Sequence, residues 1–151
     1  MTPFDYAQRM VGEVREIAGE AHSPFIQWCF ECVGYGPETP DEVPWCSAFA
    51  NRMAWLARAP RSKSAAARSW LNVGKAIDLR GATPGHDVVI LKRGTGTQPG
   101  PDVIKAPGHV GFFAGYDPQQ RTVYVLGGNQ SDGVTVQGFR EDQVLGVRRL
   151  A

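Results

Sequence analysis

The 151-residue chain has few cysteines and no long apolar run, and each of these absences excludes a class of protein. Its three cysteines are Cys29, Cys32 and Cys46, and an odd number cannot all pair in a disulfide framework. No stretch approaches the roughly 20 apolar residues that a membrane-spanning helix requires. The formal net charge is only +1, without a basic block, so the sequence is not typical of a nucleic-acid-binding protein.

The first residues lack the features of an export signal. The segment "MTPFDYAQRM" has no cationic start followed by an apolar run, so no signal peptide is predicted. We therefore expect a protein that is made in the cytoplasm and reaches any outside target only after release or injection. The length fits a single domain over residues 1–151, which is enough to bury a core, and we expect a monomer.

The order of the sequence patterns predicts an α+β fold. The first half is helical in character and the second half contains short β-branched and apolar runs, which favours helices on one face of an antiparallel sheet of about five strands. Helices are predicted from residue 4 to about Gly19, from Ser23 and Pro24 onward, from Cys46 onward, and over residues 62–77. Strands are predicted in "HDVVIL", "HVGFFAGY", "TVYVLGG", "GVTVQGF" and "VLGVRRL".

Cys29 and Cys32 form an isolated C-x-x-C motif in the segment "CFEC". A redox motif of this kind usually follows a strand, and no strand is predicted here. A zinc site needs about four ligands, and His22 supplies only a third. We interpret both cysteines as residues of one helix, with at least one packed inside, and we predict no metal site.

Cys46 lies in a different setting, within "EVPWCSAFANRMAW". Pro44, with Asp41 as a possible cap, indicates that an amphipathic helix begins at or just before Cys46. The unpaired N–H groups at a helix start favour an anion, and they therefore lower the pKa of a thiol placed there. Cys46 is thus a candidate nucleophile, and the alternative is a small apolar residue of the core.

A cysteine nucleophile also requires an imidazole and a polar group that orients the imidazole. His109 opens the strand "GHVGFFAG" between small residues, and the next strand ends in "LGGNQSDG". If the two strands pair through the turn "DPQQ", His109 and Asn129 become neighbours on one face of the sheet. We therefore predict that the Asn129 amide oxygen accepts the His109 ring N–H that faces away from Cys46.

Five ordered blocks of the sequence resemble the NlpC-type and CHAP-type cell-wall hydrolases, in particular their compact, single-domain, phage-associated branch. The blocks are "PWCSAFANRMAWLA", "SAAARSWLNVGKAI", "DVVILKRG", "GHVGFFAG" and "VLGGNQSDGVTV…VLGVRRL". The resemblance implies a papain-like α+β fold that acts on peptidoglycan without a metal or organic cofactor. It also implies Cys46 as the nucleophile, His109 as the general base and Asn129 as the orienting group.

Some positions depart from this pattern or allow two interpretations. Related enzymes often have a glutamate where this chain has Gly127. Trp45 either packs against the helices or lines a substrate groove, for which Gly108 and Gly128 are further candidates. Arg68 is expected to form a salt bridge, with a substrate carboxylate as the alternative partner. The loop over residues 93–107 is expected to border the groove.

The expected activity is hydrolysis of an amide bond in peptidoglycan. The bond lies either within the stem peptide, which makes the protein an endopeptidase, or between peptide and sugar, which makes it an amidase. An endolysin that waits for membrane disruption, or an effector injected by a secretion machine, fits the missing export signal. Two alternatives stay open: an inactive module of the same fold that holds peptidoglycan or a virion partner, and a papain-like transferase or deamidase.

Overall fold

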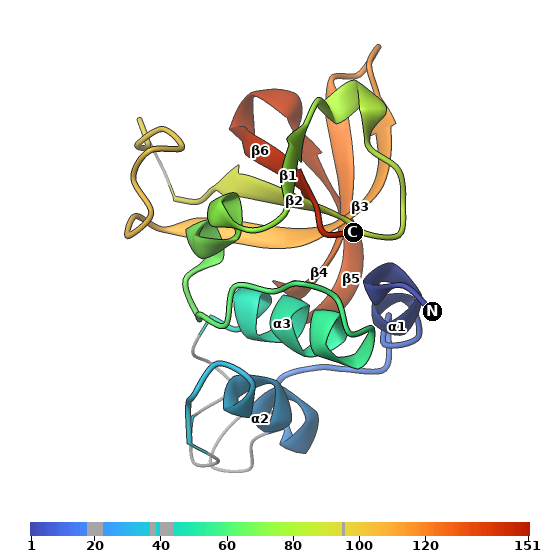
Figure 1. Ribbon diagram of the computed structural model, residues 1–151, viewed down its shortest axis with the longest axis vertical. Helices are drawn as coiled ribbons and strands as arrows, with labels where there is room; N and C mark the ends of the chain where they lie inside the picture. Colours follow the sequence, from blue (N-terminus) through green and yellow to red (C-terminus); the bar gives the residue numbers. More distant parts are fainter. Residues whose placement is uncertain (18–22, 37–38, 40–43, 95) are drawn as a thin grey trace.

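The computed structural model describes residues 1–17, 23–36, 39, 44–94 and 96–151 (Figure 1). Within these residues the chain forms helices that pack against a six-stranded antiparallel sheet. The predicted α+β class is confirmed, with one strand more than expected. None of the described helices is long and apolar enough to cross a membrane.

The elements alternate little along the chain, since the α-helices precede the sheet. The helices are α1 (Pro3–Gln8), α2 (Pro24–Glu31) and α3 (Cys46–Leu56), with the 3₁₀ helices η1 (Ala67–Asn72), η2 (Leu79–Gly81) and η3 (Glu141–Gln143). The strands are β1 (Lys75–Ile77), β2 (Asp87–Lys92), β3 (Gly108–Asp117), β4 (Thr122–Gln130), β5 (Gly133–Arg140) and β6 (Val144–Arg149).

The strands lie in the order β1-β6-β2-β3-β4-β5, so the last strand inserts between the first two. The predicted hairpin of β3 and β4 is present, with Phe112 opposite Leu126. Its turn is held by the Asp117 carboxylate, which accepts the backbone N–H groups of Gln119 and Gln120 at 3.0 and 3.2 Å.

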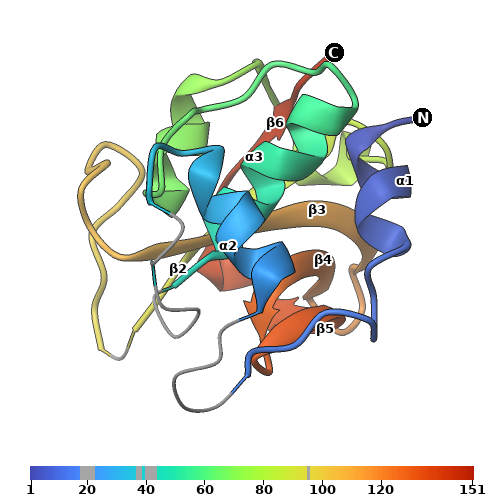
Figure 2. The ribbon, with the colours of Figure 1, turned by 90° about the horizontal axis from the view of Figure 1, so that it is seen from below.

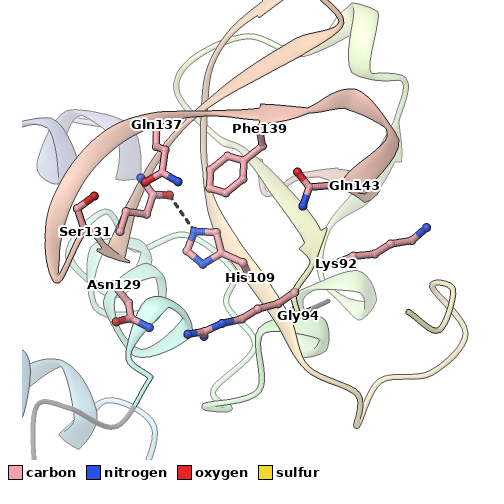
Figure 3. Close-up of a pocket in the computed structure, with 10 residues that line it drawn as sticks. Lys92, Gly94, His109, Asn129, Ser131, Gln137, Phe139 and Gln143 are labelled. Atoms are coloured by element: carbon pink, nitrogen blue, oxygen red, sulfur yellow. Dashed lines mark hydrogen bonds between the residues drawn. The ribbon is translucent and has the colours of Figure 1, made fainter. Parts of the chain in front are cut away.

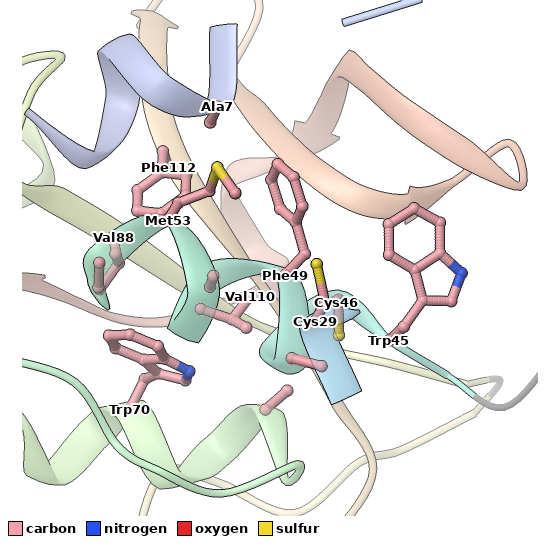
Figure 4. Close-up of a cluster of buried hydrophobic side chains, with 14 of the residues drawn as sticks. Ala7, Cys29, Trp45, Cys46, Phe49, Met53, Trp70, Val88, Val110 and Phe112 are labelled. Atoms are coloured by element: carbon pink, nitrogen blue, oxygen red, sulfur yellow. The ribbon is translucent and has the colours of Figure 1, made fainter. Parts of the chain in front are cut away.

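The main core lies between α3 and one face of the sheet, where α3 contacts β3 and β4. Helix α1 packs beside α3, and α2 lies on the side of α3 that faces away from the sheet (Figures 1 and 2). Figure 4 shows the side chains that fill this core, among them Phe49, Met53, Trp70, Val110 and Phe112. A smaller apolar cluster, which includes Val89, Leu91, Phe113, Val123 and Val125, covers the other face.

The first helix is shorter than its apolar periodicity predicts, because the following segment pairs with β5. Helix α1 ends at Gln8, and the Gly12 N–H donates to the Val134 carbonyl at 3.1 Å. The Val134 N–H in turn donates to the Val14 carbonyl at 3.1 Å, and Gly12 takes a φ of +79° that a helix does not allow. These bonds to β5 replace the helical ones, so tertiary pairing overrides local helix preference.

The predicted helix over residues 62–77 is also wrong in its extent. The structure has only the 3₁₀ turns of η1 there, followed by β1, which pairs with β6 through Lys75 and Arg149. Between them Gly74 has a φ of +69°, and a Cβ atom there would lie 2.3 Å from the Arg149 carbonyl oxygen. The helical turns end before Gly74 because the following residues pair with β6 at the edge of the sheet.

Met53 provides a test of how much the helix–sheet core contributes to stability. Its side chain is fully buried between α3 and the sheet, so Met53→Ala leaves a cavity and should lower the free energy of unfolding by about 2–5 kcal/mol. Urea denaturation measures this, with Val136→Ala as a control because Val136 is 49% exposed. Equal losses in the two variants would contradict this assignment of the core.

Candidate active site

Cys46 is the first residue of α3, as predicted, and borders an open cleft. Trp45 occupies the N-cap position without a side-chain cap bond, and the Phe49 N–H makes a helical bond to the Trp45 carbonyl at 2.9 Å. Asp41, the expected cap, lies outside the described residues. The N–H groups at the start of α3 therefore lack helical acceptors and create a positive end beside the thiol.

His109, the second residue of β3, meets Cys46 beneath the start of α3. The His109 ring lies within hydrogen-bonding reach of the Cys46 thiol, and the backbone N–H of Val110 also donates toward the sulfur. Both side chains are almost fully buried, with 3% and 6% exposure. The two residues that the sequence pattern paired are thus brought together.

The contact shifts both groups toward their charged forms. Burial raises the pKa of the Cys46 thiol, but the charge and hydrogen bond of His109 outweigh burial, and the net pKa is lowered. Burial lowers the pKa of His109, but the Cys46 charge and the hydrogen bonds to Cys46 and Gln130 outweigh it, and the net pKa is raised. Both shifts favour the thiolate–imidazolium form of the pair over the neutral thiol and imidazole.

The orienting hydrogen bond to His109 comes from Gln130 and not from Asn129. The His109 Nε2 atom lies 2.8 Å from the Gln130 Oε1 atom, which is the dashed contact in Figure 3. No hydrogen bond of the described residues joins Asn129 to His109, although both line the same pocket. The predicted Asn129–His109 bond is therefore corrected to Gln130–His109.

The surroundings of Gln130 determine which way its amide points. Its Nε2 group donates to the Val125 carbonyl at 3.1 Å and to the Thr135 carbonyl at 2.8 Å. The amide oxygen must then face His109, and an oxygen can only accept. His109 consequently carries a proton on Nε2, and its Nδ1 atom is the one left for Cys46.

The backbone at Asn129 explains why sequence alternation pointed to the wrong residue. Asn129 has a φ of +59°, and the β4–β5 register shifts between Gly127 and Gln130. A bulge of this kind adds one residue, so Gln130 takes the face that regular alternation assigns to Asn129. A signal was present: Asn129 and Asp132 are of the types that most readily adopt positive φ, and both do so, together with Ser131 between them.

Two glycines let β4 approach the site closely. A Cβ atom on Gly127 would lie 2.6 Å from the Gln130 Oε1 atom, so a side chain there would displace the orienting amide. A Cβ atom on Gly128 would lie 2.5 Å from the Trp45 ring. Trp45 itself is fully buried, and its indole N–H donates to Glu16 at 2.9 Å. Trp45 and Gly128 therefore belong to the packing and do not line the groove.

Two clefts flank the Cys46–His109 pair. The Cys46 cleft has a volume of about 450 Å³ and the His109 cleft about 220 Å³. The Cys46 cleft is lined by Pro44, Cys46, Ala65, Ala66, Ala67, Arg93, Lys105, Ala106, Pro107 and Gly108. The His109 cleft is lined by Lys92, Arg93, Gly94, His109, Asn129, Gln130, Ser131, Gln137, Phe139 and Gln143 (Figure 3). Gly108 thus lines the Cys46 cleft, and the two ends of the loop over residues 93–107 border the two clefts.

The walls of the Cys46 cleft are fixed by buried polar side chains. Ser47 donates to the Ser64 carbonyl at 2.6 Å and accepts the Trp70 indole N–H at 2.9 Å, which holds the alanine segment beside Cys46. The buried Arg68, which follows Ala67, donates to the carbonyls of Pro107, Gly100 and Val103 at 2.9, 2.7 and 3.1 Å and so ties this segment to the loop before β3. Among the described residues Arg68 has no acidic partner, so the expected salt bridge is replaced by bonds to the loop backbone.

Cys29 and Cys32 belong to a different part of the core. Cys29 is fully buried in α2, where burial raises the pKa of its thiol, and Cys32 caps the end of that helix. All three cysteines are free, and the described residues contain no cluster of three or more metal-binding side chains. The interpretation of "CFEC" as helix packing is confirmed, while His22 lies outside the described residues.

No family model matches the chain, and the search of curated proteins likewise gives no match. The interpretation of the site therefore rests on its geometry and on the chemistry of its residues.

Substitution of Gln130 should change the reactivity of Cys46, whereas substitution of Asn129 should not. Gln130→Ala removes a hydrogen bond that raises the pKa of His109, so the imidazolium is less populated and the pKa of Cys46 rises. We expect alkylation of Cys46 by iodoacetamide near pH 6 to slow by about tenfold, with convergence to the wild-type rate at high pH. The pH–rate profile, followed by mass spectrometry of the modified peptide, measures this.

Asn129→Gly is the matched control, because glycine keeps the positive φ and removes only the amide. Its profile should stay within about twofold of wild type, since the orienting bond is intact. Gln130→Glu keeps an oxygen that accepts the His109 ring N–H, so Cys46 should still be alkylated near pH 6. If alkylation of Cys46 were slower in Asn129→Gly and unchanged in Gln130→Ala, Asn129 and not Gln130 would be the residue that orients His109.

Proposed function

We propose that the protein is a hydrolase that cleaves an amide bond through Cys46, with His109 as the acid–base group and Gln130 as its positioning residue. The observation that carries this proposal is the chain of contacts from a thiol at a helix start, through an imidazole, to an amide whose orientation the backbone fixes. Open clefts on both sides give an extended substrate access to this pair.

The residues support a two-step reaction. The Cys46 thiolate attacks the amide carbonyl, and the His109 imidazolium then gives its proton to the departing nitrogen as the C–N bond breaks. Water, deprotonated by neutral His109, attacks the resulting thioester, releases the carboxylic acid and restores the thiolate–imidazolium pair. The Gln130 oxygen keeps the ring directed at sulfur through both steps.

The start of α3 also supplies a site for the oxyanion. The backbone N–H of Cys46 precedes the first helical hydrogen bond and lies next to the atom that is attacked. A developing negative charge there is stabilised by this N–H and by the positive end of the helix. The same electrostatic feature that stabilises the thiolate thus stabilises the intermediate.

The substrate that we propose is peptidoglycan, cut within the stem peptide or at the sugar–peptide amide. Support comes from the five sequence blocks that resemble the NlpC-type and CHAP-type hydrolases. Further support comes from the arrangement itself, since a nucleophile helix packed against an antiparallel sheet, with histidine at a strand start, fits a papain-like fold. Amide side chains in the His109 cleft suit a peptide or sugar–peptide substrate. We propose an endolysin-like role in wall degradation.

Loss of the sulfur is the direct test of this mechanism. Cys46→Ala should lower the rate at which purified cell walls lose turbidity to well below about a tenth of the wild-type rate, because no other group in the contact chain replaces the nucleophile. The fold should persist, since the change in side-chain volume is small. Wall turbidity and circular dichroism report the two effects.

A Cys29→Ala, Cys32→Ala double variant is the matched control, because these thiols lie away from both clefts. It should keep its activity per folded molecule even if it is less stable. Clearing of walls by Cys46→Ala at a wild-type rate would rule out the cysteine mechanism. Wall material left intact by the wild-type enzyme, despite a reactive Cys46, would point to the inactive binding module.

A further inference from the structure

The His109 cleft continues into a third cleft, which we call the adjoining cleft. The adjoining cleft has a volume of about 320 Å³ and shares Lys92, Gly94 and Gln143 with the His109 cleft. Figure 3 shows Gln143 and Lys92 on one side of the His109 ring, opposite Asn129. None of the described residues that line the Cys46 cleft lines the adjoining cleft. The two clefts therefore form one groove that begins at His109 and leads away from Cys46.

Most residues that line this groove are uncharged, and many of them are amides. The amides are Gln98, Asn129, Gln130, Gln137 and Gln143. At the far end Arg140 and Asp142 form an ion pair, with the Arg140 Nε atom 3.3 Å from the Asp142 Oδ1 atom, so their charges offset each other. Amide groups donate and accept hydrogen bonds as a peptide backbone does. The groove therefore suits an extended, uncharged peptide.

Gln143 lies where the two clefts meet, and its amide is oriented by the backbone. Its Oε1 atom accepts the Arg140 N–H at 3.3 Å, as part of the cap of η3. The oxygen of an amide only accepts and the NH₂ group only donates, so the Nε2 group of Gln143 is directed away from the Arg140 N–H. No described residue accepts a hydrogen bond from this Nε2 group. Two N–H donors are therefore available to a ligand at the junction of the clefts.

The proposed mechanism decides which part of the substrate this groove receives. His109 gives its proton to the departing nitrogen, so the amine part of the substrate lies on the His109 side of the bond that is cut. The two candidate bonds lie within the stem peptide and between sugar and peptide. In both cases the departing amine belongs to a peptide. The groove therefore receives a peptide that begins at the scissile bond.

We propose that the amine side of the scissile amide is recognised as a peptide of at least two residues. The first residue occupies the His109 cleft of about 220 Å³, and the second occupies the adjoining cleft. The Gln143 Nε2 group donates to a carbonyl oxygen of this peptide, which makes Gln143 a specificity-determining residue. This inference rests on the proposed amide hydrolysis and deepens it.

The first experiment varies the length of the amine part. Peptides with an identical acyl part carry one, two or three residues on the amine side, and each ends in a carboxamide so that the terminal charge is constant. We expect kcat/KM to rise by about fivefold or more from one residue to two, because the second residue adds contacts in the adjoining cleft. Equal kcat/KM values for one and two residues would overturn the proposal.

The second experiment tests Gln143 with two substitutions that differ in what they preserve. Gln143→Glu keeps an oxygen for the Arg140 N–H but removes the donor, and Gln143→Ala removes the donor without adding charge. Both should lose most of the gain in kcat/KM that the second residue gives. Gln119→Ala, an exposed position in the β3–β4 turn outside these clefts, should keep the gain. A full gain in both Gln143 variants would contradict the role of this residue.

The third experiment detects binding without cleavage. Alkylation of Cys46 by iodoacetamide is followed in the presence of a dipeptide amide or a single amino-acid amide. The dipeptide amide should slow alkylation at a lower concentration, and this difference should shrink in Gln143→Ala. An oligomer of N-acetylglucosamine is added in parallel. Protection by the oligosaccharide and not by the dipeptide amide would assign the groove to a glycan and overturn the proposal.

Failure of the groove and failure of the hydrolysis give different results. If no amide is cleaved but the dipeptide amide protects Cys46 through Gln143, the proposed hydrolysis is wrong and the peptide groove stands. If walls are cleared but kcat/KM is independent of the length of the amine part, the hydrolysis stands and the groove is wrong. Absence of both cleavage and protection would overturn both.

Discussion

The contact between the start of α3 and the start of β3 is the interaction on which the site depends. It places the Cys46 thiol against the His109 imidazole in a setting where either charge alone is costly to bury. Together the two groups compensate for burial, and the helix end and the Val110 N–H stabilise the thiolate further. The packing of one helix on one strand thus lowers the pKa of the Cys46 thiol despite its burial.

The rest of the structure keeps this contact in place and accessible. Ser47 ties the alanine segment to α3, Arg68 ties that segment to the loop before β3, and Gln130 fixes the imidazole. Gly127 makes room for Gln130 beside the ring. These groups are buried polar residues or glycines, and each is explained by what it holds next to Cys46 and His109.

Much of the fold was predictable because its patterns are local. The Ser23–Pro24 start of α2, the start of α3 at Cys46, and the hairpin of β3 and β4 all follow from caps, apolar spacing and turn residues. The errors arose where distant backbone intervened. Val134 of β5 pairs with the segment after α1, and β6 pairs with the segment that became β1. The helix preference of a segment depends on its own residues and so does not indicate pairing with a distant strand.

For the candidate site, the sequence by itself determined the thiol at a helix start and the histidine at a strand start, because both positions follow from patterns of a few residues. Only the tertiary structure decided that Gln130 orients His109, since a positive φ at Asn129 shifts the strand by one residue and exchanges its faces. Tertiary structure also decided that Trp45 is core and that Arg93 faces both clefts. Burial and the direction of a side chain depend on neighbours that are remote in the chain, and a linear pattern does not contain them.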